Sequence, residues 1–171
     1  MKMSDKELVE LVINGEKEAY KEIMMRYEDK LYSIAYSLTL NEEDTKDIVQ
    51  ESFFNAYTHL SRFKFKSSLQ TWLSKITYNT SINYIKKMRK DRSINDYSNL
   101  QSKHSNIDER IMIKRALLKL TAKERAIFLM HNNEGMKHKE IGESLGIKEG
   151  TVKSFHFRAI EKLQKYLKEI L

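Results

Sequence analysis

The sequence predicts an all-α protein of two small helical domains joined by a flexible linker, the second ending in a helix-turn-helix. Its 171 residues include no Pro and five Gly, which is little turn-forming material for a sheet protein. The abundant Leu, Lys, Glu, Ile and Met favour helices. Apolar residues recur every three or four positions along most of the chain, as in amphipathic helices. Between residues 93 and 106 this pattern gives way to polar residues, which is typical of a linker.

The first predicted domain, residues 1–92, contains four helices, and three of them start with capping residues. Ser4 and Glu7 form a capping-box pattern, Asn41 precedes a first turn of three acidic residues, and Ser67 stands three residues before Gln70. The expected helices cover residues 4–14, 16–40, 41–60 and 67–92. Residues 62–68 interrupt the apolar pattern and are expected to form a basic loop.

The second predicted domain, residues 107–171, begins with a helix up to residue 120. Thr121 and Glu124 form another capping box that starts the next helix. Two short helices then flank Gly146, a residue suited to a left-handed helix cap, which is the helix-turn-helix pattern. Its second helix would enter the major groove with the residues that point away from the apolar face: Lys153, Ser154, Phe157 and Arg158. A solvated helical hairpin of a bundle could carry the same apolar spacing.

The overall charge favours an anionic partner, because the net charge is +7 and the sequence pI about 9.4. The charge is unevenly distributed: residues 62–92 have a net charge of +8, whereas residues 1–61 have a net charge of −6. In the basic segment, cations alternate with aromatic rings, a combination that holds single-stranded nucleic acid through phosphate contacts and base stacking. The expected contacts are Phe63, Lys64, Phe65, Lys66, Asn79 and Asn83, whereas Trp72 is expected in the core.

Asp47, Gln50 and Glu51 share one helix face, which favours a stripe that faces solvent or a partner protein. No third carboxylate or histidine is spaced to complete a catalytic site, and the five histidines are scattered along the sequence. With no cysteine, a disulfide framework and thiolate chemistry are excluded. We therefore expect no enzyme, no catalytic residues, no metal site and no cofactor. The amino-terminal residues lack an apolar signal core and no 18-residue apolar run occurs, so a cytoplasmic protein without membrane insertion is expected.

Three motifs, in order, resemble those of the extracytoplasmic-function (ECF) group of bacterial RNA polymerase sigma factors, in the sigma-70 family. They are DIVQESFFNAY at residues 47–57, WLSKITYN at residues 72–79 and GTVKS at residues 150–154. The resemblance implies that residues 1–92 are region 2, that 93–106 are a tether, and that 107–171 are region 4. The implied function is to bind core RNA polymerase, direct it to specific promoters and promote transcription initiation.

The resemblance also implies a role for each candidate surface. Asp47, Gln50 and Glu51 would bind the core polymerase, the 63–69 loop with Asn79 and Asn83 would capture unpaired bases of the −10 element, and Lys153, Ser154, Phe157 and Arg158 would read the −35 element. An anti-sigma factor is a further implied partner. The sequence departs from the family pattern at Asn83, Phe155, His156, Ile160 and the capping position Lys137, and these departures bear mainly on −35 recognition.

Two other functional classes remain open at this stage. A helix-turn-helix regulator acting as a dimer without polymerase would leave the Asp47 stripe and the basic loop unused, and it would give palindromic footprints. A helical adaptor without a DNA role would leave the basic segment unexplained. Its binding would also lack the steep salt dependence that phosphate contacts impose.

Overall fold

The computed structural model describes residues 3–91 and 109–170, and these residues are helical apart from short turns and the 63–68 loop. The elements are α1 (Asp5–Ile13), α2 (Lys17–Thr39), α3 (Glu42–His59), η1 (Leu60–Arg62), α4 (Leu69–Asp91), α5 (Glu109–Leu118), α6 (Ala122–Asn132), α7 (His138–Leu145) and α8 (Glu149–Ile170). This confirms the all-α prediction and the helix-turn-helix at the end of the chain. The predicted linker, residues 93–106, lies outside the described residues. Within the described residues, no helix is long and apolar enough to cross a membrane.

Three predicted helix caps are confirmed and a fourth is corrected. Ser4 and Thr121 form capping boxes with Glu7 and Glu124, and the Asn41 side chain accepts a hydrogen bond from the Asp44 backbone. The cap of α4 is one residue later than expected. The hydroxyl of Ser68, rather than that of Ser67, accepts the hydrogen bond from the Thr71 backbone nitrogen, at 3.1 Å. Two serines in this stretch have the capping spacing, Ser67 three residues before Gln70 and Ser68 three residues before Thr71. The sequence pattern alone therefore does not show which serine caps the helix.

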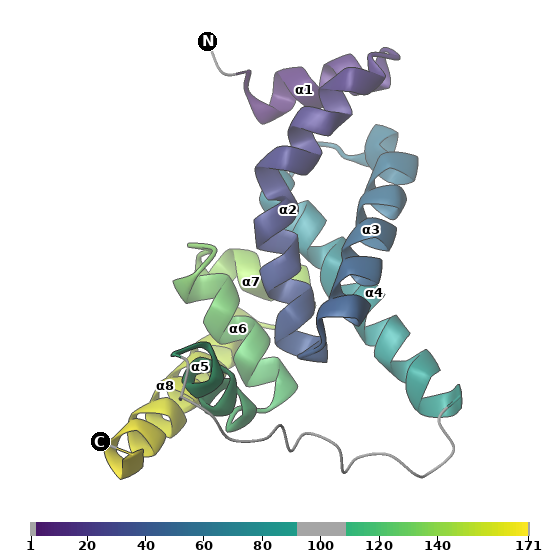
Figure 1. Ribbon diagram of the computed structural model, residues 1–171. Helices are drawn as coiled ribbons and strands as arrows, with labels where there is room; N and C mark the ends of the chain where they lie inside the picture. Colours follow the sequence, from purple (N-terminus) through teal and green to yellow (C-terminus); the bar gives the residue numbers. More distant parts are fainter. Residues whose placement is uncertain (1–2, 92–108, 171) are drawn as a thin grey trace.

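The first half of the chain encloses one hydrophobic core between α1, α2, α3 and α4 (Figure 1). Its fully buried side chains come from the apolar face of each helix and include Leu8, Ile23, Leu31, Ile48 and Leu73. Tyr20 lies inside this core and donates its hydroxyl hydrogen to the Phe53 carbonyl oxygen, at 2.6 Å. Burial of apolar side chains in such a core is the main favourable contribution to folding.

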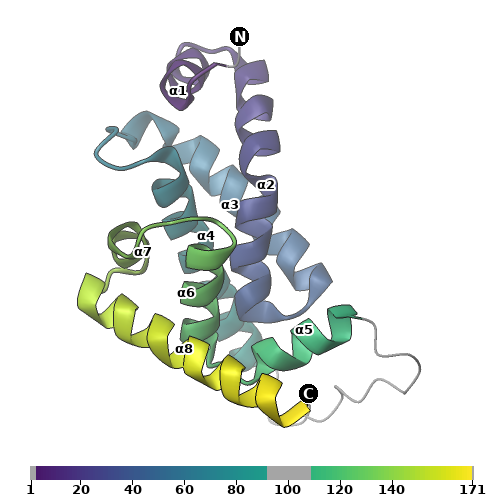
Figure 2. The same ribbon diagram turned by 90° about the vertical axis from the view of Figure 1, so that its left-hand side faces the viewer.

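The second half is a layer of four helices in which α8 runs beneath α7, α6 and α5 (Figure 2). Two clusters hold it together. One contains Ile127, Met130, Ile141 and Val152, and the other contains Leu117, Leu120, Leu129 and Ala159. The spacing predicted for α8 is confirmed, because Val152 and Ala159 are fully buried on one face of this helix.

The two halves pack directly against each other, a contact that the sequence did not predict. Helix α6 lies on α2 and α7 lies on α4 (Figures 1 and 2). Ile34 of α2 belongs to the core of the second half rather than the first. The Ser144 hydroxyl donates to the Thr71 carbonyl oxygen at 3.1 Å, and the Gln70 side-chain amide donates to the Glu134 carbonyl oxygen at 3.0 Å.

Arg125 makes a buried polar contact between the halves. Its Nε donates to the Ser37 carbonyl oxygen and its Nη1 donates to the Leu117 carbonyl oxygen at 3.0 Å. Ser37 lies in the last turn of α2, where carbonyl groups have no partner within the helix and a cation is favoured by the helix dipole. Burial lowers the pKa of Arg125 from its ordinary value. Arg125 therefore caps a helix of the other half at the cost of partial desolvation.

Candidate nucleic-acid interface

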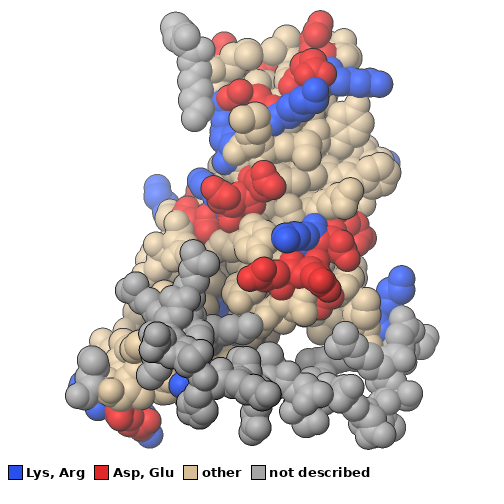
Figure 3. Space-filling model, viewed as in Figure 1, with Lys and Arg blue, Asp and Glu red and all other residues tan. Residues whose placement is uncertain are grey.

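The polar stripe of α3 is fully on the surface. Asp47, Gln50 and Glu51 are exposed, whereas Ile48, Val49 and Ser52 on the adjoining face are buried. Acidic side chains gather over this helix, with a basic residue among them (Figure 3). The i, i+3, i+4 spacing gives the stripe a continuous face that no other described helix covers.

An open groove adjoins this stripe between α2 and α3. It has a volume of about 450 Å³, and its lining includes Gln50, Met24, Phe54 and Tyr57. The Phe54 side chain is 69% exposed, whereas its neighbour Phe53 is in the core. Exposed aromatic side chains beside a polar rim are typical of protein interaction sites.

The basic loop after η1 presents one aromatic ring and buries the other. Phe63, which was expected to contact nucleic acid, is 7% exposed and belongs to the first core. Phe63 closes the core below the loop, with its ring centroid 5.1 Å from Trp72. Phe65 is 42% exposed, its centroid lies 4.8 Å from Phe63, and Lys64 and Lys66 on either side are exposed.

The backbone of Phe65 has a φ of +53°, which is rare for a bulky residue. Strained conformations of this kind persist where the surrounding structure enforces them, and they cluster at functional sites. Here, the strained turn holds an aromatic ring at the surface between two lysines.

The two asparagines of α4 lie on its exposed face, as predicted. Asn79 and Asn83 are exposed one turn apart, while Thr80 and Ser81 between them are buried. The Tyr84 hydroxyl donates to the Asp44 carboxylate at 2.7 Å, which fixes this part of α4 against the start of α3. The exposed amides could thus contact a ligand without disturbing the helix packing.

The helix-turn-helix is formed by α7 and α8. Gly146 caps α7 with a φ of +67°, as predicted. Gly142 allows the turn to close, because a Cβ at this position would lie 2.7 Å from the Ile147 carbonyl oxygen. The predicted contact residues of α8, Lys153, Ser154, Phe157 and Arg158, are all exposed. Phe157 is 63% exposed, and the Arg158 guanidinium lies 4.5 Å from the centroid of the Phe155 ring.

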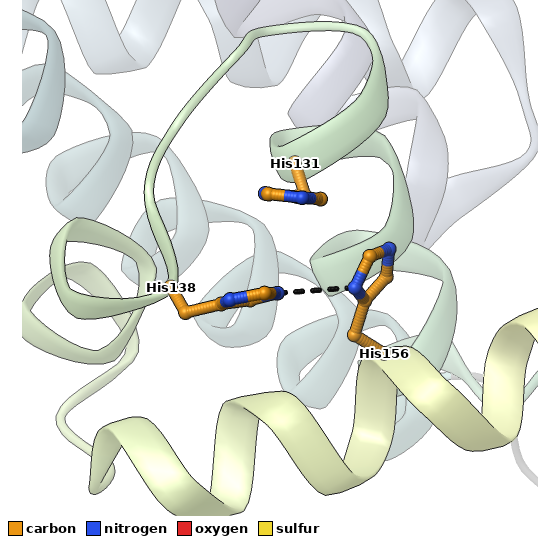
Figure 4. Close-up of side chains that lie close together, drawn as sticks. All are labelled: His131, His138 and His156. Atoms are coloured by element: carbon orange, nitrogen blue, oxygen red, sulfur yellow. Dashed lines mark hydrogen bonds between the residues drawn. The ribbon is translucent and has the colours of Figure 1, made fainter.

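Three histidines that are far apart in the sequence lie together, which corrects the expectation that the histidines are scattered. His131 lies in the last turn of α6, His138 begins α7 and His156 lies on α8 (Figure 4). His59 is exposed at the end of α3, and His104 lies outside the described residues. Burial and the neighbouring imidazoles lower the pKa of His138 and His156. The three residues lie on three different helices, so only the packing of these helices reveals the cluster.

Comparison with known proteins identifies the family of this chain. The family described as sigma-70 region 2 matches residues 23–91, and the family described as sigma-70, region 4, matches residues 110–163, together well over half of the chain. The chain belongs to the sigma-70 family. It is similar to the ECF RNA polymerase sigma factor SigW of Bacillus subtilis, with 28% identity over 99% of this chain and 100% of that protein. It is also similar to the ECF sigma factor SigM of Mycobacterium tuberculosis, with 24% identity over 96% of this chain and 85% of that protein. The protein is an ECF sigma factor, and sigma factors direct RNA polymerase to promoters.

Two solved structures share the fold of this sigma factor. CnrH, in complex with the cytosolic domain of CnrY, aligns with a TM-score of 0.75 and 23% identity over 96% of this chain and 97% of that chain. The sigma factor RpoE of Bartonella quintana, in complex with the anti-sigma factor NepR, aligns with a TM-score of 0.73 and 24% identity over 87% of this chain and 96% of that chain.

Proposed function

We propose that this sigma factor is a non-catalytic specificity subunit that binds core RNA polymerase through α3 and promoter DNA through α4 and α8. Residues 1–92 would act as region 2, residues 93–106 as the tether and residues 107–171 as region 4. The observation that carries the proposal is the placement of an acidic stripe, a basic aromatic loop and a recognition helix on three separate exposed surfaces. Its site of action is the cytoplasm, where the polymerase works.

The polymerase would bind the α3 stripe together with the neighbouring groove. Asp47 and Glu51 supply charge for orientation, and the exposed ring of Phe54 supplies apolar area close to Gln50. Charge complementarity steers association, and close charge pairs across an interface can also add affinity, while buried aromatic side chains are frequent hot spots. A surface of this composition suits a protein partner better than a nucleic acid, because its carboxylates would repel phosphates.

The −10 strand would bind along the 63–66 loop and the exposed face of α4. Phe65 offers a ring on which an unpaired base can stack, and Lys64 and Lys66 can contact the adjoining phosphates. Asn79 and Asn83 can hydrogen-bond base edges because each amide both donates and accepts. Phe63 supports this site from beneath through its contact with Phe65.

The −35 duplex would bind the exposed face of α8. Arg158 can form paired hydrogen bonds with a guanine edge, Lys153 and Ser154 can contact phosphates, and Phe157 can contact a thymine methyl group. In the protein without DNA, Lys153 is paired with Glu149 at 2.8 Å, so DNA binding would exchange this surface ion pair for a phosphate contact. Such surface pairs contribute little to stability, which makes the exchange inexpensive.

Binding to both promoter elements requires the two halves to separate. Elements centred about 25 base pairs apart lie about 85 Å apart along B-DNA, at 3.4 Å per base pair. The 23-residue helix α2, which spans much of the long dimension of the protein in Figure 1, is about 35 Å long. We infer that the packing of α6 on α2 and of α7 on α4 belongs to a closed form that opens on the polymerase. An anti-sigma factor that stabilises the closed form is a hypothesised partner.

The polymerase assignment is tested by titrating purified core RNA polymerase with the full-length protein. We expect Asp47→Ala and Glu51→Ala to weaken binding at least tenfold, and Glu28→Ala, which removes an exposed acid on α2, to leave it unchanged. Equal affinities for all of these proteins would overturn the assignment. The alternative of a regulator acting without polymerase is not favoured, because the region 2 match would then have no role. A palindromic footprint without polymerase would support that alternative.

A further inference from the structure

We propose that His131, His138 and His156 form a binding site for a divalent transition metal of the zinc type. One ring nitrogen from each of the three side chains lies within 4.8 Å of the others. The rings come from α6, α7 and α8 and point toward one another (Figure 4). The site lies apart from the three surfaces assigned above, and metal binding by itself does not depend on the proposed function.

The hydrogen bonds of the cluster indicate which nitrogens face the metal. His131 Nδ1 lies 2.8 Å from the Met136 carbonyl oxygen, so this nitrogen carries the hydrogen and Nε2 keeps its lone pair. A backbone carbonyl that orients an imidazole in this way is the usual partner of a metal-binding histidine. His138 Nε2 and His156 Nδ1 lie 3.0 Å apart and share one hydrogen between them. These three nitrogens form the proposed ligand set.

The spacing of the nitrogens is close to that of a tetrahedral site. With zinc–nitrogen bonds of 2.0–2.1 Å, two ligand nitrogens lie about 3.3–3.4 Å apart. The His138–His156 pair already has nearly this separation. The widest separation in the cluster, up to 4.8 Å, must shorten by about 1.5 Å. The partly exposed rings of His131 and His138 have room to make this adjustment by side-chain rotation.

The donor set favours zinc over the harder cations. Neutral imidazole binds Zn²⁺, Co²⁺, Ni²⁺ and Cu²⁺, whereas Mg²⁺ and Ca²⁺ prefer oxygen ligands. Three histidines with a fourth position open to solvent is an established zinc arrangement.

Metal binding would replace the hydrogen bond between His138 and His156. The Asn132 side-chain nitrogen lies 3.0 Å from His156 Nε2, so in the metal-free state Asn132 donates and His156 Nδ1 carries the hydrogen. On binding, this hydrogen moves to Nε2 and Nδ1 coordinates the metal. Asn132 would then turn its amide oxygen toward Nε2 to accept the hydrogen bond.

The consequence for the protein follows from the position of the site. The three ligands join the helix before the helix-turn-helix and both of its helices, so a bound metal would fix α8 relative to α6 and α7. His156 lies on the buried face of α8, next in sequence to Phe157 and two residues from Arg158. Phe157 and Arg158 lie on the exposed face, which is proposed to read the −35 element. We infer that metal binding strengthens −35 recognition. This second step, unlike metal binding itself, rests on the proposed function.

The test uses the untagged full-length protein, freed of metal with a chelator and titrated with Zn²⁺ alone by calorimetry. Co²⁺ serves as a spectroscopic probe, because tetrahedral coordination gives intense visible absorption. We expect one Zn²⁺ per chain, a melting temperature raised by several degrees, and at least tenfold weaker binding for His131→Gln and His138→Gln. These two side chains are only partly buried, so both variants are expected to fold. His59→Gln, which removes an isolated exposed histidine, is the matched control and should bind as the parent does.

Two results would overturn the site: no stoichiometric binding by the parent protein, or unchanged binding by both cluster variants. The three rings would then be a hydrogen-bonded packing cluster only. Coupling to DNA is measured separately, as the affinity of the metal-loaded and metal-free protein for a −35 duplex. A gain in affinity with Zn²⁺ that is lost in His138→Gln supports the coupling, and equal affinities refute it while leaving the metal site intact. A duplex that binds neither form refutes the proposed −35 role instead.

Discussion

Phe65 is the residue at which folding stability and DNA binding should respond in different ways. Its backbone has a φ of +53°, and its ring is partly exposed beside Phe63. A left-handed backbone costs an ordinary L-residue about 1–2 kcal/mol, which glycine avoids. Glycine loses about 0.5–1 kcal/mol more than alanine through its greater freedom in the unfolded chain. The balance favours glycine, so we predict Phe65→Gly to be about 0.5–1 kcal/mol more stable than Phe65→Ala.

Both substitutions remove the same ring and should damage DNA binding equally. Base stacking on an aromatic side chain contributes about 1–3 kcal/mol, so affinity for a single-stranded −10 oligonucleotide should fall about 5- to 150-fold. Urea denaturation of the free protein measures the stability difference. Fluorescence anisotropy of a labelled oligonucleotide, with the protein bound to core polymerase, measures the affinity. Phe157→Ala, which removes an exposed ring on α8, should leave this affinity unchanged.

Either measurement can refute the reasoning. If Phe65→Ala is as stable as Phe65→Gly or more so, the loop does not hold residue 65 at a positive φ in solution. If the oligonucleotide binds both variants as tightly as the parent protein, the Phe65 ring does not stack on a base.

Three further predictions concern the packing of the helices. Arg125→Met should lower the free energy of unfolding by about 2–3 kcal/mol, because charged hydrogen bonds of about 1.5–3 kcal/mol each are lost and only partly offset by relief of a buried charge; an unchanged urea midpoint would contradict this. Glu124→Gln should cost about 1–2 kcal/mol at neutral pH, because it breaks the 2.7 Å pair with the half-exposed Lys162. Although burial opposes ionisation of Glu124, Lys162 and Thr121 lower its pKa, so the native state binds its proton less readily than the unfolded chain. The stabilisation is therefore present above the unfolded pKa of about 4.3 and is lost as the pH falls below it, so the stability difference between Glu124→Gln and the parent protein should shrink as the pH is lowered; a constant difference would contradict the assignment. Gly142→Ala should destabilise by about 1–3 kcal/mol and lower the melting temperature, because its Cβ meets a backbone carbonyl oxygen at 2.7 Å; an unchanged melting temperature would show that the turn relaxes freely.

The sequence predicted those features that depend on local chemistry. Caps at Ser4, Asn41 and Thr121 form because a side-chain oxygen satisfies a backbone N–H within three residues, and this spacing is visible in the sequence. The exposed residues of α8 follow from the 3.6-residue period once Val152 and Ala159 are placed in the core.

The features that the sequence did not predict depend on contacts between distant segments. Phe63 is buried because Trp72 and the first core close over it, whereas its sequence context of basic residues resembles an exposed loop. Ile34 fits the periodic face of α2 but packs into the core of the other half. The histidine cluster forms because three separate helices pack together, which the spacing within any one helix does not show. Local spacing gives the orientation of each side chain around its own helix, but not the helix that it meets.

The most direct measurement of the central claim is run-off transcription by purified core RNA polymerase on genomic promoter fragments, with and without this protein. We predict initiation that depends on the protein and starts downstream of a shared two-part motif. Glu51→Ala should abolish it through loss of polymerase binding, and Arg158→Ala should reduce it in proportion to the loss of −35 affinity. If no transcript depends on the protein and it does not bind core polymerase, the assignment of α3, α4 and α8 to promoter-directed initiation is wrong.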